Sequence, residues 1–360
     1  MLHGIRIVEF EALGPAPFAG MLLADLGAEV IVVHRPGAAD TPGKAERNLL
    51  DRGKRSIALD LKSPGDLTIA RALLRSAHGA TEGLRPGVME RLGLGPDDAL
   101  ALNPALVYGR MTGWGQDGPL ARQAGHDLNY LARSGALFYA GLPGQVPGVP
   151  PTMLGDIGGG ALYLTVGMLA GLMQARATGE GTVVDAAIVD GASHMMALLL
   201  SMGSAFSTHA RGQSLLDGPH WSRCYACACG GHVAVQCLEP KFYALFLERL
   251  GLTGDPLFAA QFDPSLWPQQ AAVLESLFAS RSRDDWAAVF AGSDACVAPV
   301  LSPDEAQSDP HIAARGIWQA GAPRAAPRFS TQPPARPPDP PLRGQDSAAI
   351  RTELEREGYL

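Results

Sequence analysis

The chain has 360 residues, and its 29 Lys and Arg against 36 Asp and Glu give a net charge of −7. Hydrophobic residues at 46% and charged residues at 18% are typical of a globular enzyme long enough for two domains, and they exclude a disordered chain. Because the sequence has no basic tail or stripe of Lys and Arg, we expect no nucleic-acid partner.

The N-terminal residues predict a β-α-β unit. The β-branched strand "IRIVEF" is followed by the turn "ALGPAP", the helix "FAGMLLADLG" and a second strand, "AEVIVVH". The unit lacks GxGxxG, and Pro15 and Pro17 remove backbone N–H groups that a pyrophosphate would use. Because the second strand ends in His34 and Arg35 rather than in an acidic residue, an NAD(P) oxidoreductase ranks last among the candidate functions. Arg35 suits a phosphate group, with a solvated surface arginine as the alternative.

The next segments continue the alternation of strands and helices. "RSIALDLKSPGD" predicts a short strand before a helix over 65–78, and "PALVYGRMTGWGQDGP" predicts a strand that ends in a glycine-rich turn. Helices are expected over 125–140 and 157–176, and "TVVDAAIVDGASHMMALLL" predicts a strand followed by a helix. This pattern predicts an α/β fold with a large Rossmann-like domain over 1–200.

The second half of the chain predicts a smaller α+β domain. After a linker at 201–220, residues 221–238 alternate like a hairpin, helices follow, and "CVAPVLS" is a strand, so we place this domain at 221–304. The Pro-rich stretch that follows is unable to form a core of its own, and a last helix, "SAAIRTELERE", closes the chain. We therefore expect residues 305–360 to return to the large domain and complete it.

Four of the five cysteines lie between Cys224 and Cys237. "CYACAC" with His232 suggests zinc, but no second pair of ligands accompanies it, so the small residues of a hairpin are the favoured interpretation and no metal is expected. Since "MLHGIRIVEF" runs directly into a strand, we see no signal peptide and expect reduced thiols in a cytoplasmic protein. The apolar run at 158–174 is short for a membrane span and typical of a buried helix, so no membrane partner is expected.

Three acid/base residues stand in unusual local sequences. His126 lies in "QAGHDLNY", although a single histidine is more often structural than catalytic. Asp156 lies in "GDIGGG" at an N-cap position, but three glycines exceed what a cap needs and let a ligand approach backbone N–H groups. Glu239 ends a predicted strand before Pro240, where it is either a surface residue or a carboxylate that orients a histidine.

Several blocks of the sequence, taken in order, resemble one family. They are "RIVEFEALGPAPFAGMLLADLGAEVIVVHRPG", "RGKRSIALDLKS", "EGLRPGVMERLGLG", "MTGWGQDGP", "AGHDLNY", "GDIGGG", "VVDAAIVDG" and "LEPKFY". Together they resemble the α-methylacyl-CoA racemases, a branch of the family III CoA-transferase superfamily. "GWGQDGP" marks the superfamily, and "GHDLNY" with "GDIGGG" marks the racemase branch. The resemblance spans the chain and implies the family III CoA-transferase fold in an interlocked homodimer.

The resemblance implies a role for each acid/base residue. His126 and Asp156 would be the two groups that face opposite sides of the substrate α-carbon, which agrees with the need of a racemase for one proton acceptor and one donor. The backbone N–H of Asp127 would stabilise the enolate. Glu239 would support the histidine and would come from the partner subunit, so that the active site is shared between subunits. CoA is part of the thioester substrate, and no cofactor is expected.

The resemblance also assigns residues to the CoA portion of an acyl-CoA substrate. Arginines suit the phosphates of this anionic group. The assigned residues are Arg35, Ala58, Leu59, Asp60, Leu61, Lys62, Glu82, Gly83, Leu84, Arg85, Arg91, Gly125, Leu128, Asn129 and Tyr130. The residues Met195, Met196 and Met202 either contribute to an acyl surface or pack in a core stripe, which is the commoner role at helical spacing.

The leading hypothesis is a racemase or epimerase of 2-methyl-branched acyl-CoA thioesters. The alternative is a CoA-transferase of the same superfamily in which Asp156 attacks the thioester as a nucleophile. The sequence feature that separates the two is His126, for which a transferase has no need. A non-catalytic acyl-CoA-binding protein is disfavoured because three acid/base residues are retained together.

Overall fold

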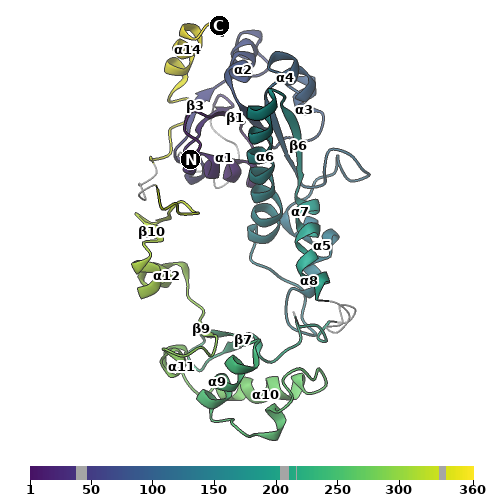
Figure 1. The fold of residues 1–360 in the computed structure, drawn as a ribbon, viewed down its shortest axis with the longest axis vertical. Coiled ribbons are helices and arrows are strands. Elements are labelled where there is room, and N and C mark those ends of the chain that lie inside the picture. Colours follow the sequence, from purple (N-terminus) through teal and green to yellow (C-terminus); the bar gives the residue numbers. More distant parts are fainter. Residues whose placement is uncertain (38–46, 203–210, 216, 332–337) are drawn as a thin grey trace. The chain divides into compact units, whose positions relative to one another are not determined.

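The computed structural model describes residues 1–37, 47–202, 211–215, 217–331 and 338–360 (Figure 1). The chain divides into two compact units. The first unit comprises Met1–Gly135, Pro150–Met196 and Gln319–Leu360, and the second comprises Ala136–Val149 and Ala197–Trp318.

A parallel sheet forms the centre of the first unit. Within the described ranges its strands are β1 (Arg6–Phe10), β2 (Glu29–His34), β3 (Arg55–Ala58), β4 (Gly79–Glu82), β5 (Val107–Thr112) and β6 (Thr182–Ala187). They lie in the order β3-β2-β1-β4-β5-β6, and every neighbouring pair is parallel. The order reverses between β1 and β4, and open α/β sheets bind ligands at the carboxyl ends of the strands at such a point.

Helices cover both faces of this sheet. They are α1 (Pro15–Asp25), α2 (Pro64–Ser76), α3 (Val88–Arg91), α4 (Pro96–Leu102), α5 (Asp127–Ser134), α6 (Leu162–Thr178), α7 (Ile188–Met195) and α14 (Ser347–Arg356). The end of the chain returns to the first unit, because α14 packs against β3 and α2 (Figure 1). The expected helix over 125–140 ends earlier than predicted, since Gly135 has a left-handed backbone with φ 87° and stops α5.

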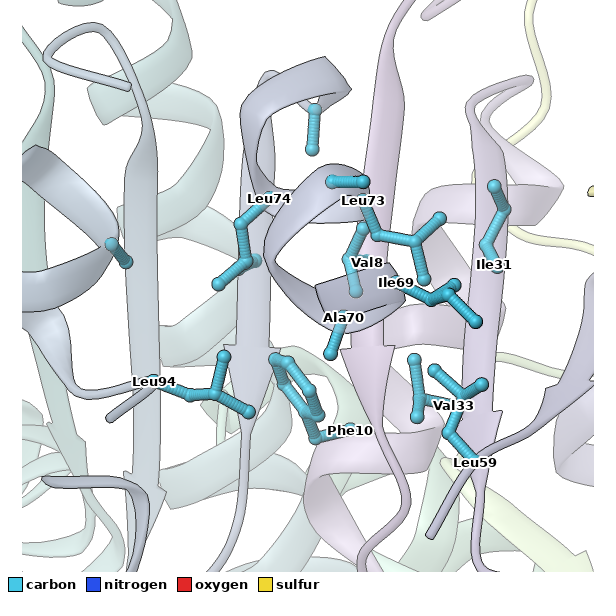
Figure 2. Close-up of a cluster of buried hydrophobic side chains, with 14 of the residues drawn as sticks. Val8, Phe10, Ile31, Val33, Leu59, Ile69, Ala70, Leu73, Leu74 and Leu94 are labelled. Atoms are coloured by element: carbon cyan, nitrogen blue, oxygen red, sulfur yellow. The ribbon is translucent and has the colours of Figure 1, made fainter. Parts of the chain in front are cut away.

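Successive side chains along each strand point to opposite faces of the sheet, so they pack in the core clusters on either side of it. Val8 of β1 and Ile31 of β2 pack with α2, whereas their sequence neighbours Ile7 and Val30 pack with α1 and α6. Figure 2 shows the first cluster, in which Leu73 of α2 lies among the strand side chains. Apolar burial on both faces explains why these strands are apolar runs rather than alternating sequences.

The longest apolar helical stretch is Met153–Thr178, in which the π-helical turns Met153–Ala161 lead directly into α6. By length and composition alone it could cross a membrane. Its residues Leu164, Met168 and Leu172 are buried in the core cluster that contains β1 and β5. One side of this helix is therefore a core element of the first unit.

The second unit is built on an antiparallel sheet of β7 (Ser222–Ala226), β8 (His232–Gln236) and β9 (Val297–Pro299). Its helices are α8 (Ala197–Ser201), α9 (Pro240–Leu250), α10 (Trp267–Phe278), α11 (Arg283–Phe290), α12 (Pro303–Ser308) and α13 (Pro310–Ala314). Large aromatic side chains fill its core, including Trp221, Tyr225 and Phe278. The short pair β10 (Trp318–Gln319) and β11 (Ala322–Pro323) follows.

The cysteine-rich stretch forms the predicted hairpin. The Gly231 carbonyl accepts a hydrogen bond from the Cys227 backbone N–H at 2.8 Å and so closes the turn between β7 and β8. Within the described residues all five cysteines have free thiols, and no group of three or more His, Cys, Asp or Glu is placed to hold a metal ion. The prediction of an α/β unit accompanied by a smaller α+β unit is confirmed.

Candidate active site

Two cavities open at the carboxyl ends of the strands of the first unit. The β2/β3 cavity has a volume of about 610 Å³ and lies beside the residues that follow β1, β2 and β3. The β4/β5 cavity has a volume of about 360 Å³ and lies beside those that follow β4 and β5. Both cavities are lined by Leu13, after β1, and by Leu84, after β4. The two cavities therefore adjoin at the reversal of strand order, where the fold predicts a ligand.

The β4/β5 cavity contains both predicted proton carriers. His126 and Asp156 line it together with residues assigned to CoA from the sequence, namely Gly83, Leu84, Arg85, Gly125 and Tyr130. Trp114, which the sequence analysis did not single out, also lines it, and its ring meets that of Tyr130 edge to face at 4.7 Å between centroids. The first unit thus places an imidazole and a carboxyl in one cavity.

The backbone of His126 is fixed at the start of α5. It immediately precedes α5, and its backbone N–H donates to the Asn129 Oδ1 atom at 3.0 Å. Its carbonyl accepts from the backbone N–H of Asn129 at 2.8 Å. The Asn129 side chain, which the sequence assigned to CoA, is therefore engaged with the helix start. Leu128 is 48% exposed, and His126 is also exposed, whereas Asp127 between them is buried.

Asp127 connects the two proton carriers. Its buried carboxylate accepts the backbone N–H of Asp156 at Oδ1, 2.9 Å away, and the backbone N–H of Thr152 at Oδ2, 3.1 Å away. The cap of the Met153–Ala161 helix is thus the side chain of Asp127. The interpretation of Asp156 as an N-cap is wrong, because Asp156 lies inside this helix and leaves its own carboxyl to the cavity. As the first residue of α5, Asp127 has a backbone N–H that no carbonyl of the helix can accept.

The surroundings of Asp156 favour its protonated form. Burial and, after it, the negative charge of Asp127 raise the pKa of Asp156 from 3.8 to about 6, against an opposing effect of His126. Burial also raises the pKa of the Tyr130 hydroxyl, and the charge of Asp156 adds to that shift. A carboxyl with a pKa near 6 can take up and release a proton close to neutral pH, as a general acid or base requires.

The glycines around the two residues serve packing. A Cβ atom on Gly125 would lie 2.7 Å from the Tyr130 ring and 3.0 Å from the Trp114 ring. A Cβ on Gly159 would lie 2.8 Å from the Ala192 backbone nitrogen, because α7 crosses this helix closely. The expectation that the glycines of "GDIGGG" admit a ligand to the backbone is therefore wrong for Gly159, which is buried against α7.

The β2/β3 cavity brings together another part of the residues assigned to CoA. Its lining contains Arg35, Leu59, Asp60, Leu61, Lys62 and Leu84. Apolar side chains such as Phe10 and Val33 form part of its surface, and the side chains of Arg35 and Lys62 are exposed. An apolar wall with exposed cations suits a ligand that combines an aromatic base with phosphates.

Five of the assigned residues line neither cavity, namely Ala58, Glu82, Arg91, Leu128 and Asn129, and the first three lie close to the loops that do. Glu82 is buried, accepts from the Leu84 backbone N–H at 2.7 Å and pairs with Arg110 at 3.0 Å. Ala58 donates its backbone N–H to the Ser347 hydroxyl at 3.2 Å. Arg91 is the last residue of α3, whose first residue, Val88, lines the β2/β3 cavity.

Glu11 and Arg343 line the β2/β3 cavity and were missed from the sequence. Glu11 directly follows β1 at the reversal of strand order, and this position is the signal that could have identified it. Arg343 precedes α14 in a Pro-rich region, where no local pattern distinguishes it.

The remaining candidates fall in both units. Glu239 is an exposed residue that precedes α9 in the second unit, and its carbonyl accepts backbone N–H groups of that helix. The side chain of Met195 lies beside Gly158, where a Cβ atom would be 3.5 Å from its methyl carbon. Met196 is half-buried at the end of α7, and Met202 follows α8 in the second unit.

The sequence profile of CoA-transferase family III matches residues 2–347. The chain belongs to CoA-transferase family III. It is 40% identical to the alpha-methylacyl-CoA racemase of Mus musculus, an alignment that covers 98% of this chain and 93% of the mouse protein. It is 39% identical to the alpha-methylacyl-CoA racemase of Homo sapiens, over 92% of this chain and 87% of the human protein.

The fold of this family member agrees with solved structures. A CAIB/BAIF family protein from Brucella suis superposes with a TM-score of 0.80 at 26% identity, covering 98% of this chain and 99% of that one. The predicted family and its fold are confirmed. Relatives at this level of identity also confirm the prediction of an isomerase of the racemase type.

Proposed function

We propose that this family member interconverts the (2R) and (2S) epimers of 2-methylacyl-CoA thioesters, with His126 and Asp156 as its acid/base pair. The observation that carries the proposal is the raised pKa of Asp156, about 6, in a cavity that His126 also lines. An imidazole and a carboxyl at one cavity can hold one proton between them, as a 1,1-proton transfer requires.

The proposed reaction moves one proton off the α-carbon and another onto it. One member of the pair accepts the α-proton, and the electrons of the broken C–H bond move into the thioester carbonyl to form an enolate. The other member donates its proton to the opposite face of the α-carbon, and the enolate collapses to the thioester. The pair ends with its protons exchanged and is ready for the reverse direction.

The enolate oxygen needs a hydrogen-bond donor, because a thioester α-proton is only weakly acidic. The backbone N–H of Asp127 is our candidate. It stands at the start of α5, where the helix dipole also favours negative charge. The Asp127 carboxylate, bonded to the N–H groups of Thr152 and Asp156, would position the donor and the acid together.

The CoA portion would occupy the β2/β3 cavity. CoA thioesters are long molecules with the reacting carbon at one end and phosphates at the other, and the two cavities adjoin at Leu13 and Leu84. Arg35 and Lys62 would meet the phosphates through exposed cationic side chains. This arrangement would leave the thioester near His126.

A homodimer is part of the proposal, with Glu239 supplied to His126 by the partner subunit. An exposed apolar stripe on α6 supports association with a second copy of the chain. Leu162, Val166 and Met173 are 44, 65 and 75% exposed at helical spacing, together with Ala170. Contiguous apolar surface of this kind marks protein interfaces. Sedimentation of the purified protein would test the dimer directly.

The deciding experiment incubates one epimer of 2-methylmyristoyl-CoA with the protein in deuterated water. We expect deuterium at the α-carbon and a drift toward both epimers. If no exchange occurs and CoA instead passes to an added free acid, the transferase with Asp156 as nucleophile is correct. The His126→Ala variant should lose most of the exchange and keep CoA binding, and full activity of that variant would refute the assigned role.

A further inference from the structure

Glu11, Arg35 and Arg343 form a closed set of hydrogen bonds at the edge of the β2/β3 cavity. Glu11 and Arg343 make a two-fold ion pair, with Arg343 Nη2 2.6 Å from Oε1 and Nη1 2.8 Å from Oε2. The Glu11 carboxylate also accepts the backbone N–H of Arg35 at 3.0 Å. Arg343 Nη1 donates to the Arg35 carbonyl at 2.9 Å. Both polar backbone groups of Arg35 are therefore held by the same ion pair.

The segment that carries Arg343 is tied to β3 on its other side. The backbone N–H of Gly344 donates to the Ser56 hydroxyl at 2.7 Å. The Ser56 backbone N–H donates to Asp346 at 2.8 Å, and the Asp346 N–H returns a bond to the Ser56 carbonyl at 2.9 Å. Arg343 is therefore presented to the cavity by a stretch of chain with fixed backbone, a condition that a precise binding geometry needs.

We infer that Arg343, on the returning C-terminal segment, is a positioning residue for the CoA end of the substrate. Together with Glu11 it fixes the backbone of Arg35. This inference rests on the proposed function. Glu11 neutralises the Arg343 charge, so the contribution of Arg343 to an anionic ligand comes from geometry. Among the described residues no ion pair reaches the guanidinium of Arg35, whose side chain is exposed beside the cavity. A fixed backbone at Arg35 limits where that guanidinium can reach, which lowers the entropy lost when it binds a phosphate.

The inference predicts an effect confined to substrates that carry the nucleotide. In the Arg343→Ala variant we expect the KM for 2-methylmyristoyl-CoA to rise about tenfold, with kcat unchanged. For 2-methylmyristoyl-pantetheine, which has the same reacting carbon and no nucleotide, KM and kcat should equal those of the wild type. Arg343→Lys keeps the charge and loses the bidentate geometry, so its KM for 2-methylmyristoyl-CoA should lie between those of the wild type and Arg343→Ala.

A matched control comes from the other end of the same sheet. Arg55, the first residue of β3, forms a two-fold pair with Glu353 of α14 at 2.7 and 2.9 Å. Arg55→Ala thus removes an equivalent tie between the strands and the C-terminal segment, but at the amino end of the strands. It should leave the KM of both substrates unchanged. A rise in both KM values for Arg343→Ala, or in neither, would overturn the inference.

Calorimetric titration with free CoA separates this inference from the proposed function. Wild type that binds CoA but does not racemise the thioester would refute the proposed reaction alone. Equal CoA affinity in wild type and Arg343→Ala would refute the positioning role alone, and a wild type that binds no CoA would refute both. If Arg343→Ala does not fold, the CoA affinities of Glu11→Gln and Arg343→Lys are compared with that of the wild type instead. We expect the CoA affinity to be lower in each variant.

Discussion

Glu9 and Asp156 are both acids of the first unit whose pKa values are raised by burial, and their partners differ. Glu9, on β1, has the Lys54 ammonium 2.8 and 2.7 Å from its two oxygens, and both side chains are at most 1% exposed. Asp156 has a second carboxylate as its neighbour, since Asp127 accepts its backbone N–H. Within the described residues no lysine or arginine pairs with Asp156.

Under the proposed function, this difference distinguishes an acid that stabilises the fold from an acid that carries a proton. Beside Glu9 the buried Lys54 ammonium favours the charged carboxylate and opposes the effect of burial on its pKa, so the pair offsets part of the cost of removing both charges from water. A buried carboxyl beside another carboxylate at a cavity has its charged form disfavoured and its proton accessible to a substrate. Burial alone therefore does not distinguish the proposed catalytic acid from Glu9, whereas the lack of a paired cation and the position at a cavity do.

The largest expected effect follows from Asp156→Asn. Since an amide cannot exchange a proton in this role, α-deuterium exchange should fall about a thousandfold for the epimer that Asp156 deprotonates. CoA affinity should be unchanged, because Asp156 lies in the β4/β5 cavity, away from the CoA phosphates in the proposed pose. Proton nuclear magnetic resonance of the thioester in deuterated water measures the exchange. Retention of even a tenth of the rate with both epimers would mean that Asp156 is not a proton carrier.

The same variant tests the raised pKa through stability. The folded protein keeps a proton on Asp156 up to a pH of about 6, whereas an unfolded carboxyl releases it near 3.8. The folded wild-type protein therefore loses stability as the pH rises through this window. The Asp156→Asn variant has no titrating group at this position and does not lose that stability. Denaturant unfolding should show Asp156→Asn gaining stability relative to wild type between about pH 4 and pH 7. A constant difference across this range would contradict the shift.

The second expected effect concerns Glu9. Lys54→Met leaves a buried carboxylate without its cation and should lower the free energy of unfolding by about 3–5 kcal/mol. The double variant Glu9→Leu/Lys54→Met should recover most of this stability, because an apolar pair has no charge to desolvate. Arg351→Met, which breaks a more exposed pair with Asp66 at 3.0 Å, serves as control and should change stability by less than about 1 kcal/mol.

Activity adds a check on the same comparison. Molecules of Lys54→Met that remain folded should exchange the α-proton at the wild-type rate, because Glu9 lies in the core and lines neither cavity. A large fall in kcat at full folding would place Glu9 in the chemistry and remove the contrast with Asp156. The folded fraction is read from the denaturant curve under the assay conditions.

Local sequence patterns predict the framework of this molecule well. The β-branched run before "ALGPAP" forms β1, and the alternating residues around Cys229 form the β7–β8 hairpin. These elements depend on neighbours within a few residues, which a periodic pattern records. The juxtaposition of His126 with Asp156 came from family resemblance, because no local pattern links residues so far apart.

The contacts that tune the site were beyond the sequence. The Asp127 carboxylate bonds to N–H groups 25 and 29 residues away, and Arg343 pairs with Glu11 across 332 residues. Such pairs depend on how the chain is folded back and leave no periodic trace. Gly159 and Gly160 of "GDIGGG" show the same limit, since their small size is needed for the crossing of α7, a helix later in the chain.

The smallest expected effect tests the neighbouring charge itself. Asp127→Asn removes the second cause of the raised pKa of Asp156 and leaves burial, the first cause, in place. The pKa of Asp156 should therefore fall, and the acid limb of the kcat/KM profile should move to lower pH by less than about one unit. The asparagine still offers one oxygen to the backbone N–H groups, so some stability is lost while the direction of the shift remains readable. Exchange rates measured from low to neutral pH give the position of the acid limb independently of the maximum rate. If the limb stays in place or moves to higher pH, the charge of Asp127 does not set the protonation of Asp156.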